Sequence, residues 1–136
     1  MATFSKYYKK EITDAVATEG TANKLKLALF TTAHPYANAS TQEHYADISA
    51  NECTGAGYTA GGKLLTSVAS TNAGDKARLT ADNVVWNAIT VSARYAVLYN
   101  TDTGHIRAQY DFGSEKSVTA GTLTLAWSAF GVFEIL

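Results

Sequence analysis

A long β-hairpin is the sequence feature that most constrains the fold of this chain. Apolar side chains occupy every odd position over residues 89–99, and Thr90, Ser92 and Arg94 take the other face, which predicts a long extended strand. A second alternating segment covers residues 106–112, and the turn-forming residues 100–104 separate the two segments. Together they predict an antiparallel hairpin. The apolar positions of the first strand are Ile89, Val91, Ala93, Tyr95, Val97 and Tyr99.

Shorter strand patterns occur along most of the remaining chain. A break at residues 119–121 separates the hairpin from the strand pattern that follows it. About seven or eight strands, without crossover helices and without a Cys…Trp…Cys pattern, favour a two-sheet antiparallel β-sandwich that is not an immunoglobulin domain. A jelly roll is the topology that we expect, although another Greek-key sandwich fits the same pattern. The shorter patterns cover residues 24–29, 64–68, 78–80, 122–127 and 133–135.

The N-terminal segment has the period of a helix. Phe4, Tyr8 and Ile12 form an apolar stripe within residues 4–18, and Gly20 is a suitable stop. An isolated helix of this length is unstable in water unless it docks on something. We therefore expect the stripe to pack on another subunit or on the sandwich wall.

The length of the chain, 136 residues, suits one domain of ordinary size. We interpret residues 1–20 as a helical arm and residues 21–136 as a single β-sandwich domain. Residues 34–62 are predicted to form a long loop in this domain, because they hold the only proline and show little sustained period. Loops of this length are usually functional or interfacial.

Tyrosines and glycines mark the long loop as a contact surface. Tyr36, Tyr45 and Tyr58 offer large contact areas and hydroxyl groups for a partner. Four glycines, which permit positive φ or a close backbone approach, follow in the same loop. We predict that this loop is the principal contact surface and that the three tyrosines are its anchors. The glycines are Gly55, Gly57, Gly61 and Gly62.

Charge and cysteine content argue against several classes of protein. The formal net charge is −1, so the chain lacks the positive charge that non-specific nucleic-acid or anionic-membrane binding requires. A single cysteine, Cys53, permits no intrachain disulfide. No apolar run approaches the roughly 18 residues that span a bilayer, and residues 1–6 do not resemble a signal peptide. We expect a protein that is made in a cytoplasm.

Two short motifs resemble catalytic signatures without their required context. Residues 57–63 match the G-x-x-x-x-G-K part of a nucleotide-binding P-loop, but Leu64 follows where a Ser or Thr hydroxyl is needed for Mg²⁺. Residues 102–104 match the Asp-Thr-Gly triplet of aspartic proteases, but polar residues precede it instead of an apolar strand. A glycine-rich loop and a hairpin turn are the preferred interpretations.

The remaining candidates for chemistry are a thiol and an ion site. Cys53 could be activated by His34, His44 or His105, but no spacing selects a partner. Glu43, His44 and Asp47 could bind a divalent ion, although a solvated loop face is the more common arrangement. We therefore predict no catalytic residue, no metal, no cofactor and no enzymatic activity.

Three blocks of the sequence resemble small virion proteins of tailed bacteriophages, of the capsid decoration (cement) type. The first block is Leu29–Ala33, which follows the amphipathic helix. The second is Asn51–Tyr58, leading into Gly61 and Gly62, and the third is Ala93–Tyr99, followed by Asp111–Gly113. Cys53 departs from the family pattern, in which an aliphatic residue follows Asn-Glu, and this supports a packed side chain.

The resemblance implies a jelly-roll-like protein that decorates the outer surface of a capsid. Its partners are then the major capsid protein of the same phage and further copies of itself, as a homodimer or homotrimer, with no specific nucleic acid and no membrane. The implied function is to stabilise the shell by bridging neighbouring subunits, after assembly in the host cytoplasm. A tail-fibre or tail-tip module that binds a receptor is the alternative.

Overall fold

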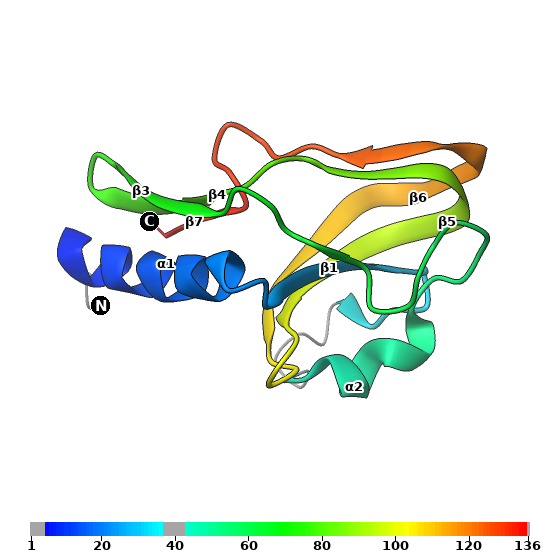
Figure 1. The fold of residues 1–136 in the computed structure, drawn as a ribbon, viewed down its shortest axis with the longest axis horizontal. Helices are drawn as coiled ribbons and strands as arrows, with labels where there is room; N and C mark the ends of the chain where they lie inside the picture. Colours follow the sequence, from blue (N-terminus) through cyan, green and yellow to red (C-terminus); the bar gives the residue numbers. More distant parts are fainter. Residues whose placement is uncertain (1–4, 37–42, 136) are drawn as a thin grey trace. The chain divides into compact units, whose positions relative to one another are not determined.

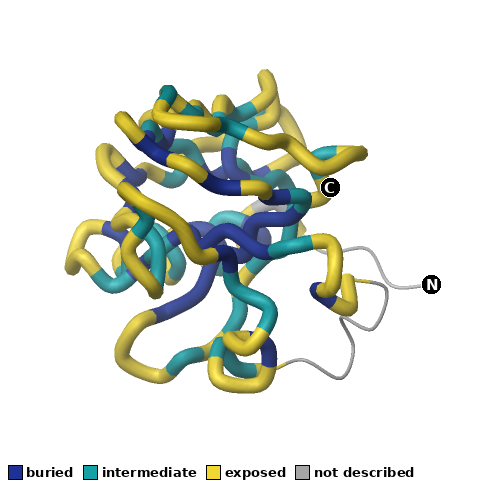
Figure 2. The backbone as a smooth tube through the Cα atoms, turned by 90° about the vertical axis from the view of Figure 1, so that its right-hand side faces the viewer, coloured by how far each residue is buried: buried dark blue, intermediate teal, exposed yellow. Residues whose placement is uncertain are grey.

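A computed structural model describes residues 5–36 and 43–135, and the chain forms two compact units (Figure 1). Each unit is assembled from segments that are far apart in the sequence. Unit 1 consists of residues 1–24, 65–83 and 125–136, and unit 2 consists of residues 25–64 and 84–124. Figure 2 colours the chain by burial, and most of the buried residues lie in two segments, 25–30 and 84–100.

Helix α1 (Lys6–Thr21) begins unit 1 and confirms the predicted N-terminal helix. The Ser5 hydroxyl caps its start by accepting a hydrogen bond from the Tyr8 amide at 3.2 Å. At the other end, the amide of Lys24 donates to the carbonyl of Glu19 at 2.9 Å. Asn23, at φ 59°, provides the left-handed residue that such a C-terminal cap needs.

The buried face of α1 is polar and small rather than aromatic. Helix α1 contacts strands β3 (Ala69–Ala73) and β4 (Lys76–Thr80) of the same unit. The Lys9 ammonium donates to the carbonyl of Asp75 at 3.0 Å, and the Thr13 hydroxyl pairs with that of Ser70. Gly20 lies so close to Val68 that a Cβ at Gly20 would be 2.6 Å from it. Small side chains at this face therefore allow the helix to approach the sheet closely.

The apolar stripe predicted for α1 does not coincide with this buried face. Tyr8 is 49% exposed and its neighbour Tyr7 is 75% exposed, whereas Ile12 is half-buried. Phe4 lies outside the described residues. Docking of the stripe on another subunit therefore stays a prediction.

The sheet of unit 1 has three antiparallel strands in the order β3-β4-β7, and β7 is Phe133–Ile135. Leu79 of β4 pairs with Ser70 on one side and with Phe133 on the other. The Arg78 guanidinium makes two hydrogen bonds, at 3.0 and 2.6 Å, to one carboxylate oxygen of Glu134. The strand predicted at residues 133–135 is thereby confirmed.

Unit 2 contains a four-stranded antiparallel sheet in the order β2-β1-β5-β6. Central strand β1 (Leu25–Phe30) is almost completely buried and pairs with β2 (Lys63–Leu64) and with β5 (Val84–Asn100). Strand β6 is Ile106–Leu125. The long loop predicted at residues 34–62 contains two short helices, α2 (Tyr45–Ile48) and η2 (Ser49–Asn51).

Strand β5 confirms the predicted alternation over residues 89–94 and shows one shift in its phase, whereas residues 95–100 are buried on both faces of the strand. Residues 89, 91 and 93 are buried as predicted, but the buried positions before them are Val84 and Trp86. The change from even to odd positions occurs at Ala88, which has φ 51°. An extra residue of this kind is a β-bulge, which returns the apolar side chains to the same face after the strand has bent.

Strand β6 is one long strand where the sequence predicts two segments. Arg94 of β5 forms an ion pair with Asp111 of β6, and the Ser92 hydroxyl contacts that of Ser117. The two contacts are two residues apart along β5 but six residues apart along β6. Residues 112–116 therefore bulge out of the ladder. The predicted break at residues 119–121 is only a local distortion, with Ala120 at φ 46°, and Trp127 lies beyond the end of the strand. Pairing with β5 keeps the strand continuous.

The predicted mainly β fold, with two antiparallel sheets and one N-terminal helix, is confirmed. Two antiparallel sheets are the elements that a β-sandwich requires. The jelly-roll topology stays a prediction.

Replacement of Gly20 tests the close contact between α1 and Val68. Alanine in a helix is favoured over glycine by about 1 kcal/mol, but the new Cβ would overlap Val68. We expect Gly20→Ala to lower the free energy of unfolding by about 1–2 kcal/mol because the contact is overpacked. In a Val68→Gly background, which removes the Cβ and both methyl groups that the new Cβ would meet, the same substitution should be neutral or stabilising. Urea unfolding of the four proteins measures both effects, and equal effects in the two backgrounds would contradict the contact.

Candidate functional site

The carboxylate of Glu52 is the centre of a hydrogen-bond network in the loop of unit 2. One of its oxygens accepts hydrogen bonds from the Tyr58 hydroxyl at 2.6 Å and from the Gly61 amide at 2.7 Å. The other oxygen accepts a hydrogen bond from the hydroxyl of Tyr45. Hydrogen bonds to an ionised group are stronger than bonds between neutral groups. This carboxylate therefore links the part of the loop around Tyr45 to the part that contains Tyr58 and Gly61.

Tyrosine hydroxyls connect this network to the sheet. The Tyr58 hydroxyl also accepts a hydrogen bond from the Leu29 amide at 2.9 Å, and the Tyr99 hydroxyl donates to the carbonyl of Gly61 at 2.7 Å. The ring of Tyr45 stacks on that of Tyr99 with centroids 4.5 Å apart. The loop is therefore attached to both β1 and β5.

The surroundings of these phenols keep them protonated. Burial and the hydrogen bond to Glu52 raise the pKa of Tyr45 and Tyr58 well above the usual range. Burial and the negative charge of Glu52 raise the pKa of Tyr99 to about 12. These hydroxyls act as hydrogen-bond donors inside the chain and are poor candidates for acid–base chemistry near neutral pH.

Two glycines allow the loop backbone to lie directly against the strands. Gly62 has φ +80°, and a Cβ there would be 2.0 Å from the carbonyl oxygen of Leu27. Gly57 has φ +80°, and a Cβ there would be 2.5 Å from the carbonyl oxygen of Ala88. The predicted need for positive φ and close approach in this loop is thus confirmed at both positions.

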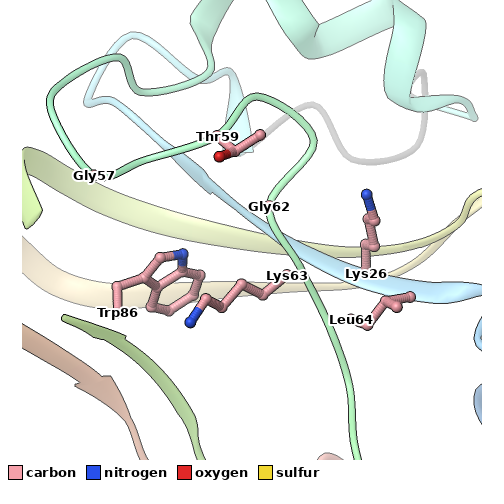
Figure 3. A pocket seen from close by; sticks show the side chains of 7 residues that line it. All are labelled: Lys26, Gly57, Thr59, Gly62, Lys63, Leu64 and Trp86. Carbon is pink, nitrogen blue, oxygen red and sulfur yellow. The ribbon is translucent and has the colours of Figure 1, made fainter.

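A hollow of about 340 Å³ lies where this loop meets β1 and β2, within unit 2 (Figure 3). Lys26 comes from β1, Lys63 from β2 and Trp86 from β5, and Figure 3 shows the Lys63 side chain running beside the indole ring. The Lys63 ammonium lies 6.0 Å from the centroid of that ring. Seven residues line the hollow: Lys26, Gly57, Thr59, Gly62, Lys63, Leu64 and Trp86.

The segment that resembles a P-loop lines this hollow but has a different construction. The amide of Tyr58 donates to the carbonyl of Gly55, and the amide of Gly62 donates to that of Thr59. These groups point into the loop itself, whereas a P-loop directs its amides at the phosphates. Lys63 also begins a strand rather than a helix. The amides of Tyr58 and Gly62 are therefore not directed at the hollow as those of a P-loop would be.

Cys53 and His34, two of the residues considered for nucleophilic chemistry, are buried in packing positions. The Cys53 thiol donates to the carbonyl of Ser92 at 3.2 Å, and burial raises its pKa to about 12. His34 is also buried, with its Nε2 2.8 Å from the side-chain oxygen of Gln109. A thiol in this environment stays protonated and is a weak nucleophile.

The residues considered for an ion site lie near one another without forming a ligand set. His44 Nδ1 is 3.9 Å from a carboxylate oxygen of Asp47, and the His44 ring packs against that of His105 at 4.6 Å. Within residues 5–36 and 43–135, no group of three or more His, Cys, Asp or Glu could hold a metal ion. In the same residues, no helix is long and apolar enough to cross a bilayer.

The Asp-Thr-Gly triplet forms the hairpin turn that the sequence favours. The side-chain oxygen of Asn100 accepts hydrogen bonds from the amides of Asp102 and Thr103, at 2.8 and 3.1 Å. This side-chain turn closes the connection between β5 and β6.

The structure brings together only some of the predicted interface residues. Tyr45 and Tyr58 are half-buried and share Glu52. Tyr36, in contrast, is 37% exposed and stacks on Tyr95 with centroids 5.1 Å apart. Their role as anchors for a partner stays a prediction.

The sequence interpretation missed Glu52, Lys26 and Trp86. One signal for Glu52 was present, because it is the single charged residue between Asp47 and Lys63. An isolated charge in a long uncharged stretch indicates a side chain with specific partners. Lys26 and Trp86 carry no comparable signal in their local sequence.

A pair of glycine variants tests how the loop is seated. Gly62→Ala and Gly74→Ala both place alanine at positive φ, which costs about 1–2 kcal/mol, but a Cβ at Gly74 would meet nothing within 4 Å. We expect Gly62→Ala to lower the free energy of unfolding by about 2–3 kcal/mol more than Gly74→Ala, because of the clash with Leu27. Urea unfolding compares the two, and equal losses would contradict the seating.

Alkaline pH tests the buried phenol of Tyr99. Its pKa rises from 10.0 to about 12 on folding, so the resulting stability is complete below pH 10 and is lost as the pH rises through 12. We expect the free energy of unfolding to fall between pH 10 and pH 12, and Tyr99→Phe to reduce that fall. Unfolding curves at several pH values measure it, and an unchanged fall in Tyr99→Phe would contradict the assignment.

Comparison of the chain with models of protein families, with curated proteins and with solved structures gives no match. The geometry of unit 2 and the sequence blocks are therefore the basis for a functional proposal.

Proposed function

We propose that this protein is a non-enzymatic virion component that decorates a phage capsid and stabilises it by bridging major capsid protein subunits. The observation that carries the proposal is that the three sequence blocks resembling decoration proteins meet at one place in unit 2. Phe30 of the first block pairs with Tyr95 of the third and forms a β-bridge with Glu52 of the second. Blocks that are distant in sequence thus form one continuous structural element.

Engagement of the reactive side chains in packing also supports a structural role. The buried thiol of Cys53, the phenols around Glu52 and the Asp102 turn all have partners that hold the fold. A structural protein places such groups where they rigidify a scaffold, whereas an enzyme directs them into a shared cleft.

Exposed aromatic side chains in both units support a bridging role. Unit 1 exposes Tyr7, Tyr8 and Phe130, which is 57% exposed, and unit 2 exposes Tyr36. Exposed aromatic rings bury a large area when a partner covers them. A bridge needs two contact surfaces, because separation of the shell subunits then requires both to release.

Self-association and location are part of the same proposal. The protein is proposed to act as a homodimer or homotrimer on the outer surface of the capsid, after assembly in the host cytoplasm. A weakly charged surface suits contacts that depend on area rather than on electrostatic steering.

Binding to empty shells tests the proposed function. Shells assembled from the major capsid protein of the same genome are incubated with the protein and imaged. We expect regular added density on the outer surface. Particles that lack the protein should lose their genome at a lower temperature than complete particles, because the bridges resist outward pressure.

Two results would contradict capsid decoration. The first is equal heat stability of particles with and without the protein. The second is immunogold label on the tail tip alone, which would favour a receptor-binding tail module.

A further inference from the structure

The imidazole of His34 is a buried polar group whose hydrogen bonding is incomplete. The side chain belongs to the segment that follows β1, and the residue is only 3% exposed. Its Nε2 lies 2.8 Å from the side-chain oxygen of Gln109 on β6. Within residues 5–36 and 43–135, its Nδ1 is the one buried side-chain nitrogen or oxygen that has no hydrogen-bond partner. Buried polar atoms are paired in the large majority of cases, so this atom requires an explanation.

The contact with Gln109 determines which nitrogen of the ring carries the hydrogen. An amide oxygen can only accept a hydrogen bond, so Nε2 is the donor. In the neutral ring, Nδ1 is then a bare acceptor, which leaves one hydrogen bond unmade. In the charged ring, Nδ1 also carries a hydrogen, and that hydrogen has no acceptor in the described part of the chain. The closed structure therefore favours the neutral ring over the charged one.

The groups that touch the ring do not compensate a positive charge. The ring centroid lies 5.0 Å from that of Phe30 on β1 and 5.4 Å from that of the titratable phenol Tyr95 on β5. Glu52 forms a β-bridge with Phe30, but both of its carboxylate oxygens accept hydrogen bonds from its own loop. None of the ion pairs among the described residues includes His34. A buried charge is costly unless it is paired.

The charged residues nearest along β6 are positive or already paired. Arg107 and Asp111 lie two residues from Gln109 on either side, so the three share one face of the strand. The Asp111 carboxylate accepts hydrogen bonds from the guanidinium of Arg94 on β5, at 3.2 and 3.4 Å. Neither residue therefore offers a free negative charge to a protonated ring.

The ring is carried by a small corner of the chain, residues 31–36, which directly follows β1. The amide of His34 donates to the carbonyl of Thr31 at 3.1 Å, and the amide of Tyr36 donates to the carbonyl of His34 at 2.8 Å. The Tyr36 ring stacks on that of Tyr95, with centroids 5.1 Å apart. The side chains of His34 and Tyr36 thus attach the corner to β5 and β6.

We propose that His34 is an acid-sensitive latch for this corner: the neutral ring holds the corner closed, and uptake of one proton from water at Nδ1 releases it. A histidine in water takes up its proton near about pH 6.5, so the open corner gains a proton for which the closed corner has no acceptor. Opening separates Tyr36 from Tyr95, which is 9% exposed in the closed form. The latch lies within unit 2 and does not depend on the proposed function.

NMR of the full chain, labelled in its histidine and tyrosine rings and in its backbone, tests the latch. The pH is lowered from about 8 to about 5, a range that brackets the titration of histidine. We expect the Tyr36 ring signals to move from a stacked to a solvent-exposed position, while the backbone signals of β1 and β5 stay in place. The ratio of open to closed corner should rise by up to about ten-fold per pH unit below about pH 6.5, because opening takes up one proton.

Two variants change the proton equilibrium of the ring in different ways. His34→Phe keeps an aromatic ring that cannot be charged, so the Tyr36 signals should no longer change with pH. Gln109→Glu places a carboxylate beside Nε2 and stabilises the charged ring in the closed corner. Opening should then shift to lower pH by about one pH unit or more. The second variant retains His34 and decides the question if His34→Phe does not fold.

His105→Gln is the matched control, because it removes an exposed histidine from the same unit. The pH dependence of the Tyr36 signals should be unchanged in this variant. The latch is wrong if these signals do not change between about pH 8 and about pH 5, if they change equally in His34→Phe, if Gln109→Glu leaves the change at the same pH, or if His105→Gln abolishes it. Simultaneous loss of the β1 and β5 signals would also overturn it, because the whole unit would then unfold.

Discussion

The hydrogen bonds to the Glu52 carboxylate are the interaction on which the arrangement of unit 2 depends. Glu52 is half-buried, and its carboxylate accepts hydrogen bonds from positions 45, 58 and 61 of a loop with little regular structure. The same tyrosines continue to the Leu29 amide and to the Tyr99 ring. One charge therefore fixes the loop to two strands, and the hollow beside Lys63 exists because the loop is fixed there.

The strands were predictable wherever burial of one face imposes a strict period of two. Residues 89–94 are an example, because a slip of one residue would expose Ile89, Val91 and Ala93. The phase shift at Ala88 and the bulge at residues 112–116 were not predictable in the same way. Alanine has no preference for positive φ, so the shift at Ala88 leaves no local sequence signal, whereas Gly113, at φ 83°, marks the bulge of β6.

Of the candidate site, only the close approach of the loop backbone to the strands was predictable from the sequence. The glycines of the loop indicated close approach, and Gly57 and Gly62 lie against the strands for that reason. The side chains that give the hollow its chemistry come from three strands, and the register that places Lys26 opposite Leu64 is a tertiary property. The P-loop spacing at residues 57–63 marks a segment that lines the hollow, but the segment is not a P-loop, because the amides of Tyr58 and Gly62 donate inside the loop.

Helix α1 shows that the face that holds a helix in the fold can be distinct from the face that carries its exposed aromatic rings. Its stable contact with β3 and β4 uses Lys9, Thr13 and Gly20, which are small or can reach a carbonyl with a flexible stem. Its tyrosines Tyr7 and Tyr8 stay exposed on the same helix, although burial of either ring would contribute roughly 1.5–3 kcal/mol. The contact of α1 with its sheet therefore does not depend on covering these two rings, and substitutions of Tyr7 or Tyr8 should leave the packing of α1 on its sheet intact.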